Sequence, residues 1–307
     1  MRQASSQLAR FHDRVLRGIA GAALCSLVAL PHLAAQARLS EKGLVAQTVG
    51  TTTITVEYYR PVARGRANIF PNVVHWGERW TPGANWATTI DVDQDVKVEG
   101  QLLPKGKYSI WTFVRPDTWT VDFHRSARRF HLNRPDSSDR QLRVAARVDS
   151  SPHTEVLTFD FPDVGTGTTT LRLRWGALAI PLHFTMFAPP LKMVAKADRA
   201  RFVGRYDVEI FSLEGGRPNQ HRLIEIAEVN DTLHWRDVEN SGQPLRDFVL
   251  SPSGPDNELT RARLSPDGQW WPEAGVTIAF TIEGGRATGF EVQILDSMPA
   301  SRAKRVR

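Results

Sequence analysis

Apolar and polar residues alternate along most of the chain with a period of two, which is typical of β-strands that bury one face. Residues 88–99 show the pattern: Ile90, Val92, Val96 and Val98 alternate with charged or polar residues. Similar runs predict further strands at residues 51–58, 108–113, 119–123, 142–148, 155–161, 169–175 and 179–187. Closely spaced strands separated by turn signals predict a jelly-roll-like β-sandwich over residues 38–188.

A second set of short strands follows the Pro189-Pro190 pair, which marks a boundary. These strands are predicted at residues 204–211, 223–229, 232–238, 246–250, 259–264, 276–282 and 288–295. They predict a small up-and-down, lipocalin-like β-barrel over residues 202–298, which makes the chain an all-β protein. Residues 189–201 are read as a linker with one or two helical turns, and residues 299–307 as a basic, solvated tail.

The N-terminus has the layout of a secretory signal peptide. Four arginines accompany an apolar run at residues 18–30, and Ala35-Gln36-Ala37 fits a cleavage signal. The run is short for a membrane span, so an uncleaved anchor is the less favoured alternative. We therefore expect cleavage after Ala37, a periplasmic or secreted location, and no transmembrane segment in the mature chain.

Cysteine usage and charge restrict the chemistry of the mature protein. Cys25 is the single cysteine and lies in the leader, where lipidation is an alternative although Leu24 precedes it instead of a small residue. Cleavage after Ala37 removes it, which excludes disulfides and thiol nucleophiles. The leader also holds +3 of the +6 net charge, so the remaining chain lacks the excess typical of nucleic-acid binders.

A series of motifs in the first domain carries a family resemblance. It includes Tyr59-Arg60-Pro61-Val62, Arg64-Gly65-Arg66, Gly83-Ala84-Asn85 and Pro104-Lys105-Gly106-Lys107-Tyr108-Ser109. In this order they resemble the DUF2911 family of exported bacterial proteins, which has no established biochemical function; the resemblance spans residues 39–187. Residues 202–290, with Gly204-Arg205-Tyr206 and a late Gly-x-x-Thr-Gly-Phe hairpin, are similar to the small DUF3471 barrel appended to many β-lactamase-like hydrolases.

The chain departs from the family pattern at one motif. The family usually reads Trp-Arg-Thr-Gly-Ala-Asn-Glu, whereas Trp80 is followed here by Thr81-Pro82-Gly83-Ala84-Asn85-Trp86. If the usual Arg and Glu form an ion pair, their joint loss is tolerable, because losing one partner would strand the other. If they are catalytic, this chain is inactive.

Common catalytic motifs are missing, which favours a function without catalysis and without a cofactor. The sequence holds no Gly-x-Ser-x-Gly, His-Glu-x-x-His or P-loop pattern. Asp91, Asp93 and Asp95 resemble the start of a calcium loop, but Val96 and Leu102 occupy the positions that need Gly and Glu. The three aspartates are therefore read as the polar face of a strand.

The long loop at residues 62–84 and its flanks hold the strongest candidates for a ligand site. Arginine clamps carboxylates and phosphates, and tryptophan stacks on flat groups and sugars. The candidates for binding an anionic or sugar-like ligand or an envelope component are Arg60, Arg64, Arg66, Trp76, Glu78, Arg79, Trp80 and Asn85. The alternative is structural, with these side chains pinning the loop to the sandwich.

A metal site is the weaker alternative. His124 and His131 would meet across a turn, with His75 or Glu78 as a third ligand of an open zinc site. The sequence thus favours an exported, non-catalytic binding or accessory protein of the bacterial cell envelope. A metal-assisted hydrolase and a purely structural envelope protein are the alternatives.

Overall fold

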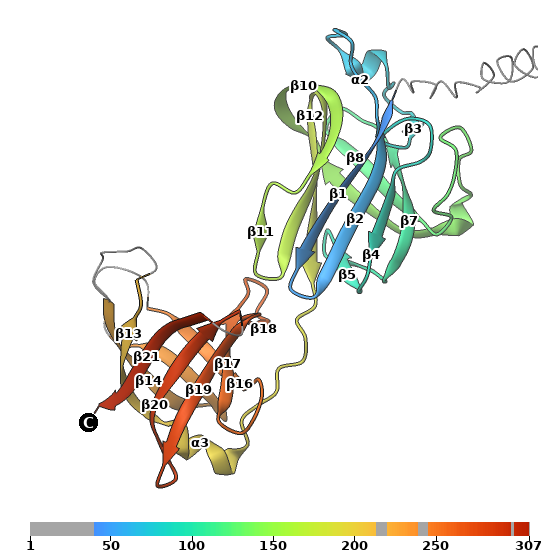
Figure 1. Ribbon diagram of the computed structural model, residues 1–307. Coiled ribbons are helices and arrows are strands. Elements are labelled where there is room, and N and C mark those ends of the chain that lie inside the picture. Colours follow the sequence, from blue (N-terminus) through green and yellow to red (C-terminus); the bar gives the residue numbers. More distant parts are fainter. Residues whose placement is uncertain (1–39, 213–219, 239–244, 296–297, 307) are drawn as a thin grey trace, which may run out of the picture. The chain divides into compact units, whose positions relative to one another are not determined.

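The computed structural model describes residues 40–212, 220–238, 245–295 and 298–306 (Figure 1). The predicted leader, its cleavage site and Cys25 lie outside these residues. The described chain is built almost wholly from antiparallel strands, which confirms the all-β prediction. No helix in these ranges is both long and apolar enough to cross a membrane.

The first domain opens with a seven-stranded antiparallel sheet. Its strands follow the order β1-β2-β4-β7-β8-β9, and β3 pairs with β7. Their bounds are β1 (Glu41–Val49), β2 (Thr52–Arg60), β3 (Arg79–Trp80), β4 (Thr89–Val92), β7 (Gly106–Phe113), β8 (Thr118–His124) and β9 (Arg140–Arg147). The short helices α2 (Ile69–Asn72) and η1 (Ser137–Asp139) lie in the connections.

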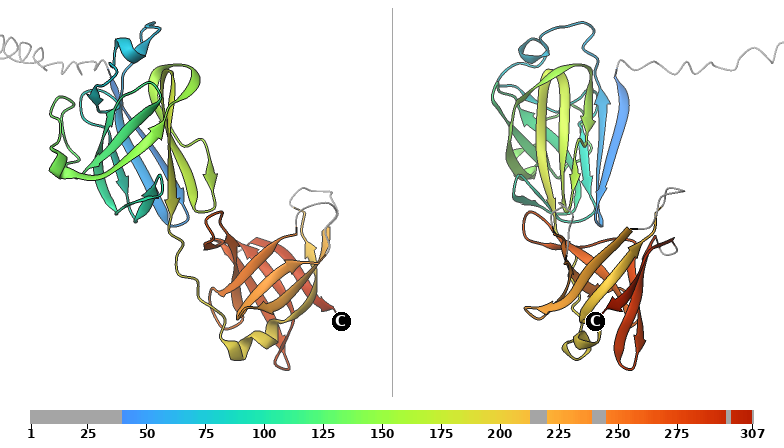
Figure 2. Two further views of the ribbon diagram at one scale, coloured as in Figure 1. Left: turned by 180° about the vertical axis from the view of Figure 1, so that it is seen from behind. Right: turned by 90° about the vertical axis from the view of Figure 1, so that its left-hand side faces the viewer.

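A five-stranded sheet forms the second layer of the sandwich, and Figure 2 shows the two layers from two sides. Its order is β10-β12-β5-β6, with β11 paired to β12. The strands are β5 (Val96–Val98), β6 (Gln101–Leu103), β10 (Asp149–Asp160), β11 (Val164–Gly165) and β12 (Thr168–Met186). Strand β12 joins two predicted strands into one, because Gly176 at φ 60° turns the backbone without ending the pairing.

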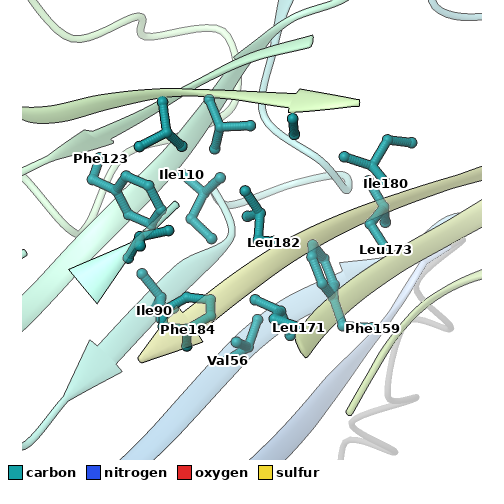
Figure 3. Packing of buried hydrophobic residues seen from close by; sticks show 14 of the residues in the cluster. Val56, Ile90, Ile110, Phe123, Phe159, Leu171, Leu173, Ile180, Leu182 and Phe184 are labelled. Carbon is teal, nitrogen blue, oxygen red and sulfur yellow. The ribbon is translucent and has the colours of Figure 1, made fainter. Parts of the chain in front are cut away.

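The two sheets bury their apolar faces against each other (Figure 3). Val56, Ile90, Ile110 and Phe123 come from the seven-stranded sheet, while Phe159, Leu171, Leu182 and Phe184 come from the other. All eight side chains are at most 5% exposed. The alternation seen in the sequence therefore places one face of each strand in this core and leaves the other face outside.

Residues 88–99 do not form the single strand predicted from their alternation. The chain leaves the seven-stranded sheet after Val92 and enters the five-stranded sheet at Val96. Two aspartates fix the crossing: Oδ1 of Asp93 accepts the Thr53 amide and Oδ1 of Asp95 accepts the Lys105 amide, both at 2.8 Å. These carboxylates therefore cap a corner of the sandwich and are not a strand's polar face.

The second domain is a closed up-and-down barrel, as predicted. Its eight barrel strands pair in chain order, and closure comes from the pairing of β21 with β13; β18 pairs with β17 outside this ring. The helix α3 (Lys196–Phe202) precedes β13 (Gly204–Ile210), β14 (Gln220–Val229), β15 (Thr232–Asp237), β16 (Asp247–Pro252), β17 (Glu258–Leu264), β18 (Trp270–Pro272), β19 (Val276–Glu283), β20 (Arg286–Ile294) and β21 (Met298–Val306).

Residues 299–307, predicted as a solvated tail, instead contain most of β21. Ser301 and Ala303 are buried, while Arg302 and Lys304 are exposed. Arg302 and Lys304 thus occupy outer positions of an alternating strand, while the half-buried Arg305 lies over the Tyr206 ring. The prediction was wrong because the short inward residues carry little hydrophobic signal.

Aromatic side chains fill the barrel interior. Tyr206, Trp235, Phe280 and Phe290 pack with ring centroids 5.1–6.4 Å apart, and each is at most 4% exposed. Small barrels are often filled by side chains in this way. Ligand binding is therefore better sought on the sandwich domain.

Candidate functional site

A groove opens on the outer face of the seven-stranded sheet, with a cavity volume of about 330 Å³. That volume is at the lower end of the usual range for small-molecule sites. Strands β1, β2, β4 and β7 supply Lys42, Glu57, Tyr59, Thr89 and Lys107. Strand pairing explains their convergence, because Lys42 lies opposite Tyr59 and Glu57 opposite Thr89.

Two lysines flank one carboxylate in this groove. Lys42 Nζ lies 2.9 Å from Glu57 Oε2, and Lys107 Nζ lies 3.5 Å from Glu57 Oε1. The hydrogen bond from Lys42 is the main reason that the pKa of Glu57 lies below its usual value, so this carboxyl is ionised at neutral pH. The lysine side chains are 52% and 44% exposed, which leaves donor capacity for a ligand.

Two loops form the remaining wall. Trp86 and Ala87 come from the connection before β4, and Ala127 and Arg128 come from residues 125–139. The guanidinium carbon of Arg128 lies 4.6 Å from the centroid of the Trp86 ring, a cation–π contact. Trp86 is 37% exposed, so an aromatic surface remains open to the solvent side of the site.

Backbone hydrogen bonds join these two loops. The Ala87 amide donates to the Arg129 carbonyl at 2.8 Å, and the His131 amide donates to the Asn85 carbonyl at 2.9 Å. Asn85 has φ 60°, a left-handed conformation that asparagine tolerates better than most residues. The conformation of Asn85 thus sets where Trp86 enters the groove.

A buried polar cluster supports the loop that carries Arg128. The Ser126 amide donates to Asp139 Oδ2 at 3.1 Å, and Ser109 Oγ donates to the Ser126 carbonyl at 2.9 Å. Trp111 Nε1 donates in turn to Ser109 Oγ at 3.2 Å. Ser126 is therefore fixed from both sides, two residues before Arg128.

His124 and Asp122 lie in the same buried layer. His124 is fully buried, and burial lowers its pKa although Asp122 and Asp139 oppose this effect. Asp122 is held by Arg143, whose Nε and Nη2 donate to its two oxygens at 2.6 and 2.7 Å. This two-point bond ties β8 to β9.

The predicted loop candidates take up other positions. None of the eight is among the residues that line the groove, although Asn85 directly precedes Trp86. Arg60 bonds the Leu157 carbonyl and the Thr158 hydroxyl, which links β2 to β10. Arg66 bonds the carbonyls of Val62 and Ala63 within its own loop.

The aromatic and charged residues of the long loop also make internal contacts. Trp80 stacks on Trp175 with centroids 6.0 Å apart, and Trp76 stacks on Phe70 at the same distance. Glu78 accepts the His75 amide at 3.0 Å. The two remaining candidates are Arg79 and Arg64. Arg79 Nη2 lies 3.8 Å from Asp122 Oδ2. Arg64 is exposed and has a left-handed backbone conformation, with φ 54°.

The histidines proposed as metal ligands are dispersed. His75 pairs with Glu78, His124 is buried between Asp122 and Asp139, and the ring of His131 packs on Phe130. Among the described residues, no group of three or more His, Cys, Asp or Glu side chains has a geometry that could hold a metal ion.

The sequence missed the groove because its residues are distant along the chain. Only Glu57 lay in a predicted strand, whereas Lys107 was assigned to the turn before residues 108–113 and Lys42 lay outside every predicted strand. In the sequence, the departure from the family motif at Trp86 was the one feature that pointed to the groove.

Fold and groove together define an all-β protein, a sandwich followed by a closed barrel, with a charged, aromatic-lined groove on its sandwich. The model of the family described as "Protein of unknown function (DUF2911)" matches residues 40–184, which supports the resemblance of the first domain. No curated protein matches the chain. A solved structure of a protein of unknown function from the DUF3598 family of Nostoc punctiforme is 9% identical, with 74% of this chain and 95% of that chain covered, but its TM-score of 0.18 supports no argument.

Proposed function

We propose that this protein is exported to the cell envelope and binds a small anionic ligand, without transforming it, in the groove of its sandwich domain. The observation that carries the proposal is the convergence of Lys42, Lys107 and Arg128 around a cavity that holds a single acidic side chain, Glu57. These four side chains carry a net charge of +2, which attracts an anion. The two lysines lie on a rigid sheet, so the site needs little reordering when the ligand binds.

The resemblance of the first domain to an exported family and the leader-like N-terminus support the envelope location. The test is to express the full chain, isolate the periplasmic fraction and determine the mature N-terminus by mass spectrometry. Cleavage after Ala37 is expected. A protein that stays in the cytoplasm with its first 37 residues would contradict the proposed location.

Binding is tested on the purified protein with a panel of small anions, by thermal shift and by calorimetry. A ligand that binds only the native state raises the melting temperature by mass action. Lys107→Ala and Arg128→Ala should each weaken binding about tenfold, whereas the exposed Arg147 on β9, outside the groove, provides the control Arg147→Ala. Equal effects of the control and groove variants would contradict this site.

A further inference from the structure

We propose, resting on the function above, that the groove selects an acidic carbohydrate: a sugar ring that carries a carboxylate or a phosphate. The groove combines three features, and a simple anion needs only the first of them. These are a cationic rim, an ionised carboxylate on the sheet and an indole with open surface, contributed by Lys42 and Lys107, Glu57, and Trp86 respectively.

The cations bind the acidic group of the ligand. Lysine acts as a compact point charge, so it accepts a carboxylate or a phosphate without demanding one geometry. Both lysines approach Glu57 from opposite oxygens, which holds the two ammonium groups on either side of it. The acidic group of a ligand at the rim of the groove can contact both ammonium groups while Glu57 keeps them in place.

Glu57 specifies what lies next to that acidic group. A carboxylate repels a bare anion but accepts hydrogen bonds, so Glu57 favours a ligand that carries hydrogen-bond donors beside its acidic group. Each carboxylate oxygen has two acceptor positions, and the two lysine contacts leave further positions unused. Thr89, opposite Glu57 on β4, adds a hydroxyl to the same surface. Hydroxyl groups of a sugar supply such donors.

Trp86 specifies a ring. An indole offers a broad, stiff apolar surface with low conformational cost, and the C–H face of a sugar ring is its natural complement. Arg128 lies over the ring at 4.6 Å and Phe130 meets it edge-on, with centroids 6.0 Å apart. The indole is therefore fixed before the ligand arrives, which reduces the entropy lost on binding.

The test is calorimetry on the full mature protein with five probes: glucuronate, glucose 6-phosphate, glucose, inorganic phosphate and phenyl phosphate, which carries a ring that is not a sugar. At least one of the two sugar acids should bind about tenfold more tightly than each of the other three. The two sugar acids distinguish a carboxylate from a phosphate as the acidic group.

Two variants separate the contribution of the Trp86 ring to binding from the contribution of the charged groups. Trp86→Ala should weaken the sugar acid about tenfold and leave phosphate unchanged, while Glu57→Gln should weaken the sugar acid and strengthen phosphate. Circular dichroism and the melting temperature establish that each variant is folded.

The outcomes distinguish this inference from the broader function. If inorganic phosphate or phenyl phosphate binds as tightly as the sugar acids, and Lys107→Ala weakens that binding, the anion site stands and the carbohydrate assignment falls. If no probe binds at about 10 mM, where even a Kd of 1 mM gives nearly full occupancy, both fall.

Discussion

The Nδ1 atom of His124 lies 3.9 Å from Oδ2 of Asp139, close enough for charge attraction but beyond hydrogen-bond distance. The other ring nitrogen lies 3.8 Å from Asp122, and within the described structure neither nitrogen has a hydrogen-bond partner. A neutral imidazole thus lies in a buried layer between two carboxylates. Asp139 instead bonds the Ser126 amide, which supports the groove loop.

This arrangement makes stability depend on pH. Burial holds the pKa of His124 below its unfolded value of 6.5. Above pH 6.5 the imidazole is neutral in both states. As the pH falls below 6.5, the unfolded chain takes up a proton that the folded chain resists, so the free energy of unfolding falls until the folded pKa is passed.

We therefore expect His124→Gln to flatten the pH dependence just below pH 6.5, where one proton contributes at most about 1.4 kcal/mol per pH unit. Urea unfolding at several pH values measures this slope. A core variant that removes no titrating group, Val144→Ala, gives the control and should lower stability but keep the wild-type slope. Identical slopes for His124→Gln and the wild type would show that His124 does not titrate as argued.

Asn85 should control the position of Trp86 through its backbone. In Asn85→Ala, a left-handed conformation costs about 1–2 kcal/mol because the side chain lacks the local bonding of asparagine. We expect lower stability and weaker groove binding. Asn85→Gly tolerates the same φ and should restore binding even though the amide contact to the Ser40 carbonyl is lost.

Calorimetric Kd values for the two variants decide this point. Equal loss in Asn85→Ala and Asn85→Gly would assign the effect to the side-chain amide. That result would make the amide contact to the Ser40 carbonyl, and not the backbone conformation, the link between Asn85 and the groove.

Period-two alternation predicted most strands because one face of each strand is buried in a core. It failed where a strand's inward side chains are small or partly exposed. β1 buries only Val49 fully, and β21 has Ser301 and Ala303 inside. It also failed at Val92 and Val96, because both residues face the same core although they belong to different sheets.

The candidate site was harder to predict, for a different reason. A groove on a sheet depends on strand order and register, which bring Lys42 beside Tyr59 and Glu57 beside Thr89. The local alternation of apolar and polar residues predicts neither the strand order nor the register. Arg60 and Arg66 looked like ligand clamps, but the backbone carbonyls of the fold already use their donors.

The bond between Asp122 and Arg143 should contribute measurably to stability. Asp122 is 4% exposed, so Arg143→Met leaves a buried carboxylate without its two-point partner. A double-mutant cycle with Asp122→Asn should give a coupling free energy of about 0.5–3 kcal/mol. A coupling near zero would mean that Arg79, 3.8 Å from Asp122, replaces Arg143.

A substitution in the barrel core should lower stability without changing ligand affinity in the groove. Phe290 is 2% exposed and contacts Tyr206, Trp235 and Phe280. Phe290→Ala should cost about 3–5 kcal/mol, a large part of the stability of a single domain. Because the groove residues all lie on the sandwich, ligand affinity should remain at the wild-type value.

Differential scanning calorimetry with and without the groove ligand tests this separation. In Phe290→Ala, an early transition should appear that the ligand does not shift, followed by one that it does, because a ligand stabilises only the unit that binds it. Phe123→Ala, in the sandwich core, should instead lower the transition that the ligand shifts. A single transition in both variants, shifted as a whole by the ligand, would show that the two domains unfold together and that the barrel contributes to the stability of the binding domain.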